Sequence, residues 1–97
     1  MTTRGHPDAT SRLQQALVTF QRAQGMLLTA HRRLKGMPAE EVDRFWAAQG
    51  SQIERHLHAA AGEVIAAFKV FSAAGLVADP GDRHLITEAR RLTDEGS

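Results

Sequence analysis

The sequence predicts an all-α fold, in which two long helices form an antiparallel hairpin, a short C-terminal helix follows, and two copies dimerise into a four-helix-type bundle. Large apolar residues recur at every seventh position in the first third of the chain, with alanines recurring between them: Leu13, Phe20, Leu27 and Leu34, with Ala9, Ala16, Ala23 and Ala30. Such a repeat keeps one apolar line facing a partner helix, and alanine lets two backbones approach closely. A second line follows at spacings of three and four: Trp46, Gly50, Ile53, Leu57, Ala60, Val64, Ala67 and Phe71. No segment shows the apolar–polar alternation of a strand.

The 97 residues are expected to form a single helical domain with a flexible N-terminus over 1–7. We expect the first helix over 8–35, because Asp8 or Thr10 can cap its start and Gly36 offers the left-handed conformation that ends many helices. A chain this short buries a smaller share of its surface than a typical domain does. A partner subunit would therefore stabilise it.

The second helix is expected over 38–74, because a proline stands at its first position and acidic residues follow in its first turn. Gly75 has the position of a Schellman glycine, which ends a helix with a left-handed turn. Gly50 is followed by a capping-box pair, Ser51 with Glu54, so a break near residue 50 competes with a continuous or mildly kinked helix. We favour the continuous form, because the apolar line keeps its phase across Gly50.

The third helix is expected over 80–95, because Asp79 can cap its start and Pro80 suits its first position. Its apolar residues form one narrow stripe: Leu85, Ala89 and Leu92. A helix with one narrow apolar stripe buries that stripe against other helices. We expect it to lie as a strap across one end of the bundle.

Several large apolar residues fall outside the two lines: Leu17, Met26, Leu28, Phe45, Ile65 and Phe68. Burying one such side chain is worth about 1.5–3 kcal/mol, and the short third helix has room for only some of them. The sequence therefore predicts a homodimer that completes a four-helix core. The candidate residues of the seam and the dimer contact are Leu13, Phe20, Leu27, Leu34, Trp46, Ile53, Leu57, Val64, Phe68 and Phe71.

Charge is unevenly distributed although the net charge is only +1. Residues 1–37 hold six Arg or Lys against one acid, which gives +5, and residues 38–97 hold six against ten, which gives −4. Four basic residues, which we call the basic rim, stand at the end of the first helix: His31, Arg32, Arg33 and Lys35. Positive charge there suits the helix dipole, and it also favours an acidic partner.

The residue patterns of enzymes and cofactor sites are missing from the sequence, so no catalytic, cofactor-binding or metal-binding residue is predicted. The chain has no cysteine, which excludes disulfides and thiolate chemistry. Its five histidines lack the spacing of metalloprotease and di-iron motifs. The serines stand outside any nucleophile-elbow sequence, and the glycines are too scattered to form a phosphate-binding loop.

The cytoplasm is the expected compartment, because no apolar run follows Arg4 as it would in a secretory signal peptide. The most apolar window, residues 59–78, contains Glu63 and Lys69. Charges in the middle of a window favour a buried helix over a membrane span. Secretion without a signal peptide remains an open alternative.

Residues 75–89 resemble the wing of MarR-type winged-helix regulators, in which Gly-Leu-Val, Asp-Pro-X-Asp-Arg and Leu-Thr-X-Ala appear in that order. The likeness covers about 15 residues, and it implies a strand pair and DNA binding. No two-helix recognition unit precedes it. The chain also lacks the basic stripe and aromatic platforms of nucleic-acid binders, so we do not expect nucleic acid as a partner.

The chain also looks like the short helical hairpins exported by type VII secretion systems, in its length, its alanine content and its hairpin shape. Those proteins carry Trp-X-Gly in the turn between their helices. Here Trp46 lies well inside the second helix, with Gly50 four residues later, and no tyrosine is present for the usual export signal. The resemblance implies secretion as an alternative role.

These observations together favour a non-enzymatic protein–protein interaction or adaptor module, which acts as a homodimer and binds an unidentified protein through a helix face or groove. A secreted helical hairpin and a DNA-binding regulator with a degenerate winged-helix-like C-terminus are the alternatives.

Overall fold

The computed structural model describes residues 5–95, and 89% of this range is helical, with no strand in it. The all-α prediction is therefore confirmed. The elements are α1 (Gly5–Leu34), α2 (Ala39–Phe45), the π-helical segment η1 (Trp46–Gly50), α3 (Ser51–Ala73) and α4 (Pro80–Glu95).

Helix α1 begins at Gly5, three residues before the expected start at Asp8. Pro7 does not block this earlier start, because the N–H groups of a first helical turn have no intrahelical partner and proline lacks only that group. The rest of the expected flexible segment, residues 1–4, lies outside the described residues. At its other end α1 stops at Leu34, and Gly36 follows with φ = 85°, in the left-handed conformation expected of it.

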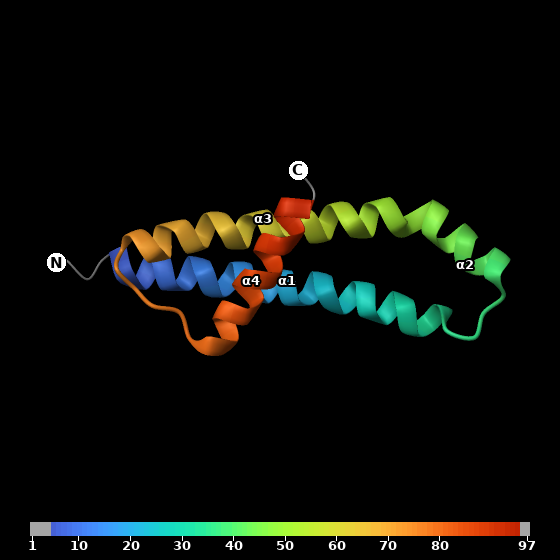
Figure 1. The fold of residues 1–97 in the computed structure, drawn as a ribbon, viewed down its shortest axis with the longest axis horizontal. Helices are drawn as coiled ribbons and strands as arrows, with labels where there is room; N and C mark the ends of the chain where they lie inside the picture. The colour runs from blue at the N-terminus through green and yellow to red at the C-terminus, as the bar shows by residue number, and fades with distance from the viewer. Residues whose placement is uncertain (1–4, 96–97) are drawn as a thin grey trace.

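The second helical run stays helical from Ala39 to Ala73 but contains one π-helical turn. Phe45, Gly50 and Ser51 all have right-handed helical backbone angles, so the chain does not break at residue 50. Ser51 is itself helical and so is not a non-helical N-cap, and the capping-box alternative is therefore wrong. A π turn is a common cause of a helix bend, and α2 turns away from the line of α3 at this point (Figure 1).

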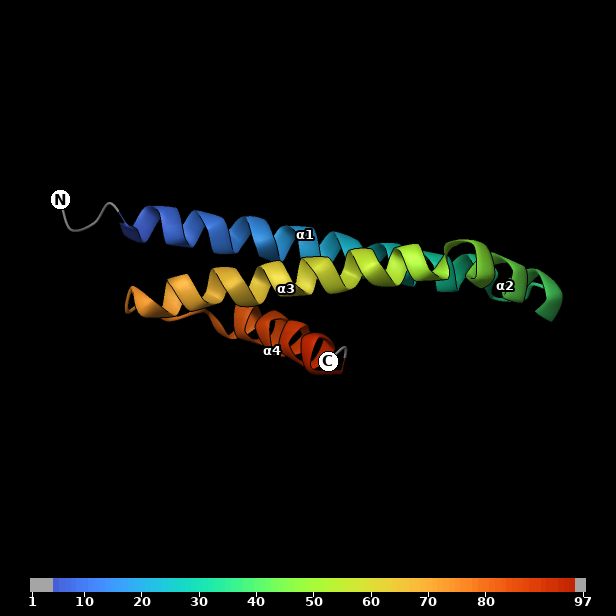
Figure 2. The ribbon, with the colours of Figure 1, turned by 90° about the horizontal axis from the view of Figure 1, so that it is seen from above.

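Helices α1 and α3 run in opposite directions and lie side by side in both views (Figures 1 and 2). Their facing lines form one apolar core, in which Leu13, Phe20 and Val64 are the largest fully buried side chains. Alanines on both helices complete this core and are themselves buried: Ala16, Ala23, Ala60, Ala61 and Ala67. The small residues let the two backbones lie close together, as the repeat indicates.

Helix α3 ends in a Schellman motif. The N–H of Leu76 donates to the carbonyl of Phe71 over 3.4 Å, and the N–H of Gly75 donates to the carbonyl of Ser72 over 2.9 Å. Gly75 has φ = 80°, and Leu76 packs back against the core. The six residues 74–79 then run back along the two helices. Extended backbone spans about 3.3 Å per residue, so this linker can reach up to about 20 Å.

Because of this linker, α4 crosses the middle of the α1–α3 pair (Figure 1), so the expected position across one end is wrong. Ile86 and Ala89 are buried in the common core, with Leu85 and Leu92 packed against it. The hydrogen bond from Gln14 Nε2 to Asp82 Oδ2, 3.0 Å long, ties α1 to the start of α4. Residues 80–95 are helical, so the strand pair implied by the winged-helix resemblance is not formed there.

Half of the apolar residues that lie outside the two lines are covered within the single chain. Leu17 is buried, and Ile65 and Phe68 pack against the core. In contrast, Met26 is 51% exposed and Leu28 is 53% exposed, while Phe45 is half-buried. These three uncovered residues outside the lines lie in the half of the molecule that contains η1, whereas Val18, Val70 and Val77 are exposed toward the other end.

The molecule is elongated, measuring 59 × 24 × 18 Å with a radius of gyration of 16.3 Å. A compact domain of this length has a radius of gyration of about 13 Å. The difference arises because α4 thickens only the middle of the pair and leaves the η1 end as a layer of two helices.

Candidate protein-binding groove

Aromatic side chains join the η1 end of the second run to α1. The ring of Trp46 lies 5.1 Å from that of His31 on α1 and 5.2 Å, edge-on, from that of Phe45. Gly50 makes room for Trp46, since a Cβ atom at Gly50 would lie only 3.1 Å from Trp46 Cε3. The π turn thus presents Trp46 to α1, and it places Phe45 beside the surface described next.

A groove of about 930 Å³ runs between α1 and the second helical run, and we call it the α1–α3 groove. Helix α1 contributes Arg22, Gly25, Met26, Thr29, Ala30 and Arg33. The opposite wall comes from Phe45, Gln49, Gln52, Ile53 and His56. Apolar side chains lie between polar ones, and such a combination is typical of surfaces that bind an apolar face and orient it through a few polar contacts.

The charge of the α1–α3 groove has one sign. Arg22, Arg33 and His56 line it, and none of its lining residues is acidic. Arg22 and Arg33 are eleven residues apart, or about 16 Å along α1, on nearly the same side of the helix. Both are exposed, and within residues 5–95 neither of them forms an ion pair. The groove therefore has two cationic groups whose donors are available to a ligand.

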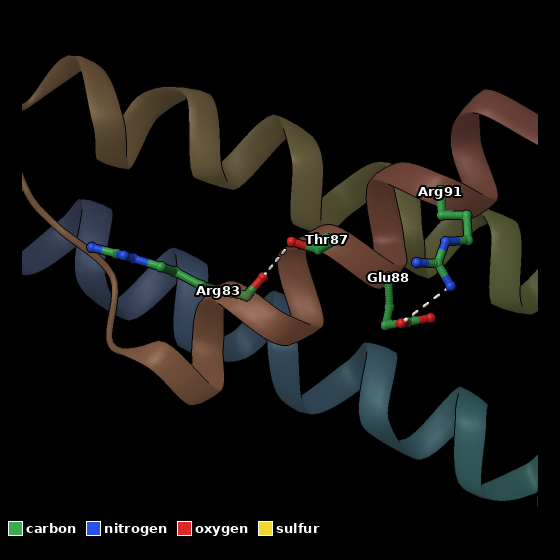
Figure 3. Close-up of polar contacts among 4 residues, drawn as sticks. All are labelled: Arg83, Thr87, Glu88 and Arg91. Carbon is green, nitrogen blue, oxygen red and sulfur yellow. Dashed lines mark hydrogen bonds and ion pairs between the residues drawn. The ribbon is translucent and has the colours of Figure 1, made fainter.

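A smaller hollow of about 370 Å³ lies beside α4, and we call it the α4 hollow. It is lined by Gln24, Leu27, Leu28 and His31 of α1, Leu57 of α3, and Glu88, Arg91 and Leu92 of α4. Unlike the groove, it carries both signs of charge. Arg91 Nη1 lies 3.5 Å from Glu88 Oε1, and Figure 3 shows the two side chains facing each other.

The groove and the hollow lie on opposite sides of α1. Met26 lines the groove and Leu28 lines the hollow, and two residues correspond to a rotation of about 200° around a helix. Because α4 contributes only to the hollow, the groove is on the side of the pair that α4 leaves open.

Most of the predicted seam residues lie inside the molecule. The buried ones are Leu13, Phe20, Leu34, Leu57, Val64 and Phe71, and the half-buried ones are Leu27, Trp46, Ile53 and Phe68. Buried side chains contribute to the fold of one chain and are not available to a partner. Of this set, Ile53 lines the groove, and Leu27 and Leu57 line the hollow.

The structure does not bring the basic rim together as one surface. His31, Arg32, Arg33 and Lys35 are all exposed, but consecutive helical residues point about 100° apart. Arg33 lines the α1–α3 groove, and His31 lines the α4 hollow and contacts Trp46. Arg32 and Lys35 line neither of them.

Sequence reasoning missed Arg22 as a partner of Arg33, and it missed Gln49, Gln52 and His56 on the opposite wall. The signal for Arg22 is present in the sequence, because residues eleven apart share a helix face and Met26 lies on that face between the two arginines. On the opposite wall, Phe45, Gln49, Gln52 and His56 also follow spacings of four, three and four, but polar residues at this spacing are typical of any solvent-facing helix side and do not by themselves indicate a groove.

Within residues 5–95, His, Asp and Glu side chains do not form a cluster of three that could hold a metal ion, and no polar or charged residue is buried. In the same range no helix combines the length and the apolar character that crossing a bilayer requires. No protein-family model, curated protein or solved structure matches this chain.

Proposed function

We propose that this chain is a non-enzymatic protein–protein interaction module that acts as a homodimer and binds another protein through the α1–α3 groove. One observation carries the proposal: a single chain leaves Met26 and Leu28 about half exposed beside two hollows on opposite sides of α1. Large apolar residues next to concave surfaces, with polar residues around them, mark sites of protein contact.

The α4 hollow is the better contact for a second copy. In a two-fold dimer the same surface meets itself, so a surface with both signs of charge can be complementary to its own copy. The hollow has Glu88 and Arg91 beside Leu28, and two copies can pair Glu88 of each with Arg91 of the other. In this proposal two antiparallel hairpins associate at their η1 ends into a four-helix-type bundle.

The α1–α3 groove then remains open for the second partner. Two copies that met through this groove would bring Arg22 and Arg33 of each close to those of the other, and like charges disfavour such a contact. The two surfaces thus have different roles, one for self-association and one for an acidic partner.

The dimer is tested by measuring molar mass by sedimentation equilibrium at micromolar protein concentration. The wild-type protein should have twice the 10.6 kDa of one chain. Leu28→Asp should reduce the mass to that of one chain without loss of helical circular dichroism, because Leu28 is 53% exposed and contributes little to the internal core.

Val18→Asp is the matched control. Val18 is also an exposed apolar residue of α1, at 44%, but it lines neither the groove nor the hollow. This variant should remain a dimer. A wild-type mass of a single chain, or equal loss of association in both variants, would refute the dimer.

A further inference from the structure

We propose that the ligand of the α1–α3 groove is an amphipathic helix with acidic residues about three turns apart, which pair with Arg22 and Arg33. This inference rests on the proposed function, because it names the class of partner that the interaction module binds. It follows from the shape, the charge and the helical surroundings of the groove.

The shape of the groove favours a helix as the occupant. Both walls are helices, and the described residues contain no strand whose edge could pair with an extended peptide. The molecule already shows an amphipathic helix on the other side of the same two helices, where α4 buries Ile86 and Ala89. A helix in the groove would turn the two-helix layer at the η1 end into a three-helix arrangement.

The apolar part of the groove defines the first requirement for the partner. Met26 is 51% exposed, and Phe45 and Ile53 are half-buried on the opposite wall. Gly25 has no side chain and that of Ala30 is a methyl group, so a partner backbone can approach α1 closely there. The facing side of the partner helix must therefore be apolar, with residues at spacings of three and four.

The charge of the groove defines the second requirement. A partner that covers Arg22 and Arg33 removes part of their hydration, and this cost is offset only where an acidic group pairs with each of them. The arginines are eleven residues apart on α1. A partner helix that lies along α1 has the same rise per residue, so its two acidic residues should also be about eleven apart.

The probes are synthetic peptides of about 18 residues, a length of about five helical turns, with leucine and alanine on one face. Three of them carry a pair of glutamates at spacings of about seven, eleven and fourteen residues, and a fourth carries lysines at the eleven-residue spacing. A scrambled peptide has the composition of the eleven-residue probe but no continuous apolar face. Binding to the full-length protein is measured by fluorescence anisotropy.

The wild-type protein should bind the eleven-residue glutamate peptide tightest of the five. Replacing Arg22 and Arg33 together by Glu should weaken this binding about tenfold or more, and it should improve binding of the lysine peptide. Raising NaCl from about 50 mM to about 300 mM should weaken binding of the glutamate peptide to the wild type, because the salt screens the ion pairs.

Two controls distinguish binding in the groove from the effects of net charge and of exposed apolar side chains in general. Replacing Arg12 and Arg32 by Glu changes the net charge equally, but both are exposed residues of α1 outside the groove, so the affinity should change by less than about threefold. Met26→Asp should abolish peptide binding, whereas Val18→Asp should leave it unchanged.

The proposal would be overturned if the wild type bound none of the glutamate peptides saturably, or bound the scrambled peptide as tightly as the ordered one. It would also be overturned if replacing Arg12 and Arg32 by Glu weakened binding of the glutamate peptide as much as replacing Arg22 and Arg33 by Glu does. If the variant with Arg22 and Arg33 replaced by Glu had a lower molar mass in sedimentation than the wild type, the groove would be the contact with a second copy instead.

The homodimer and the binding of an acidic helix in the groove are tested by different measurements, so each proposal can fail without the other. A single-chain mass for the wild type, together with peptide binding that depends on Arg22 and Arg33, would refute the dimer and support the groove. The monomeric Leu28→Asp variant should bind the peptide as the wild type does, because Leu28 lies on the other side of α1.

Discussion

Among single residues, two glycines of the second helical run illustrate how surroundings decide the role of a residue. Gly50 is buried, and a Cβ atom there would lie 3.1 Å from Trp46 Cε3. A Cβ atom at Gly62, in the middle of α3, would have no neighbouring atom within 4 Å. Both have helical surroundings, so alanine would be intrinsically favoured at either position, but only at Gly50 does an aromatic ring occupy the space.

We therefore expect Gly62→Ala to raise the free energy of unfolding by about 1 kcal/mol, and Gly50→Ala to raise it by clearly less. The indole ring must move by a few tenths of an ångström to accept a methyl group at residue 50. Urea denaturation followed by circular dichroism measures both values. The emission of Trp46, the single tryptophan, should change only in Gly50→Ala. Equal stabilisation by the two substitutions would contradict the close contact of Gly50 with Trp46.

At the scale of an element, α4 is held by its apolar stripe and by the turn that precedes it. Ile86 and Ala89 are buried against α1 and α3. The side chain of Arg83 extends along the linker (Figure 3), and its Nε donates to the carbonyl of Ala78 over 3.1 Å. These contacts fix where α4 crosses the pair, and so decide which apolar residues remain uncovered.

Ile86→Ala should lower the free energy of unfolding by about 2 kcal/mol or more, because Ile86 is buried in the common core and its truncation leaves a cavity there. The matched control is Thr87→Ala. Thr87 is exposed, and its hydroxyl donates only to the carbonyl of Arg83 within the same helix (Figure 3). This control should change stability by less than about 0.5 kcal/mol in the same urea denaturation. Similar losses in the two variants would mean that α4 does not pack as described.

Considering the whole molecule, the uneven charge of the chain is not used for contacts between its two long helices. Within residues 5–95 no ion pair joins α1 to α3, and the pair of Glu88 with Arg91 lies within α4 at the surface. The buried residues of this range are all apolar. The positive charge of α1 therefore remains available to another molecule.

Raising NaCl from about 50 mM to about 500 mM should consequently change the free energy of unfolding by less than about 1 kcal/mol at constant protein concentration. Binding of the glutamate peptide should weaken strongly over the same range, because that contact depends on Arg22 and Arg33. Parallel urea denaturation and anisotropy titrations measure the two effects. A large salt effect on unfolding would show that charge pairing holds the helices together after all.

The sequence by itself determined the helical class, the apolar lines of α1 and α3, and the left-handed glycines, Gly36 and Gly75, that end them. Periodicity and glycine conformation are local properties, so they are readable without knowledge of the fold. Only the tertiary structure decided where α4 crosses the pair and that a π turn precedes Ser51. The apolar pattern of a helix records which of its residues are suited to burial, but not which other element covers them. For that reason Leu17 and Met26, both outside the repeat, could not be told apart until the packed structure placed Leu17 in the core and left Met26 in the groove.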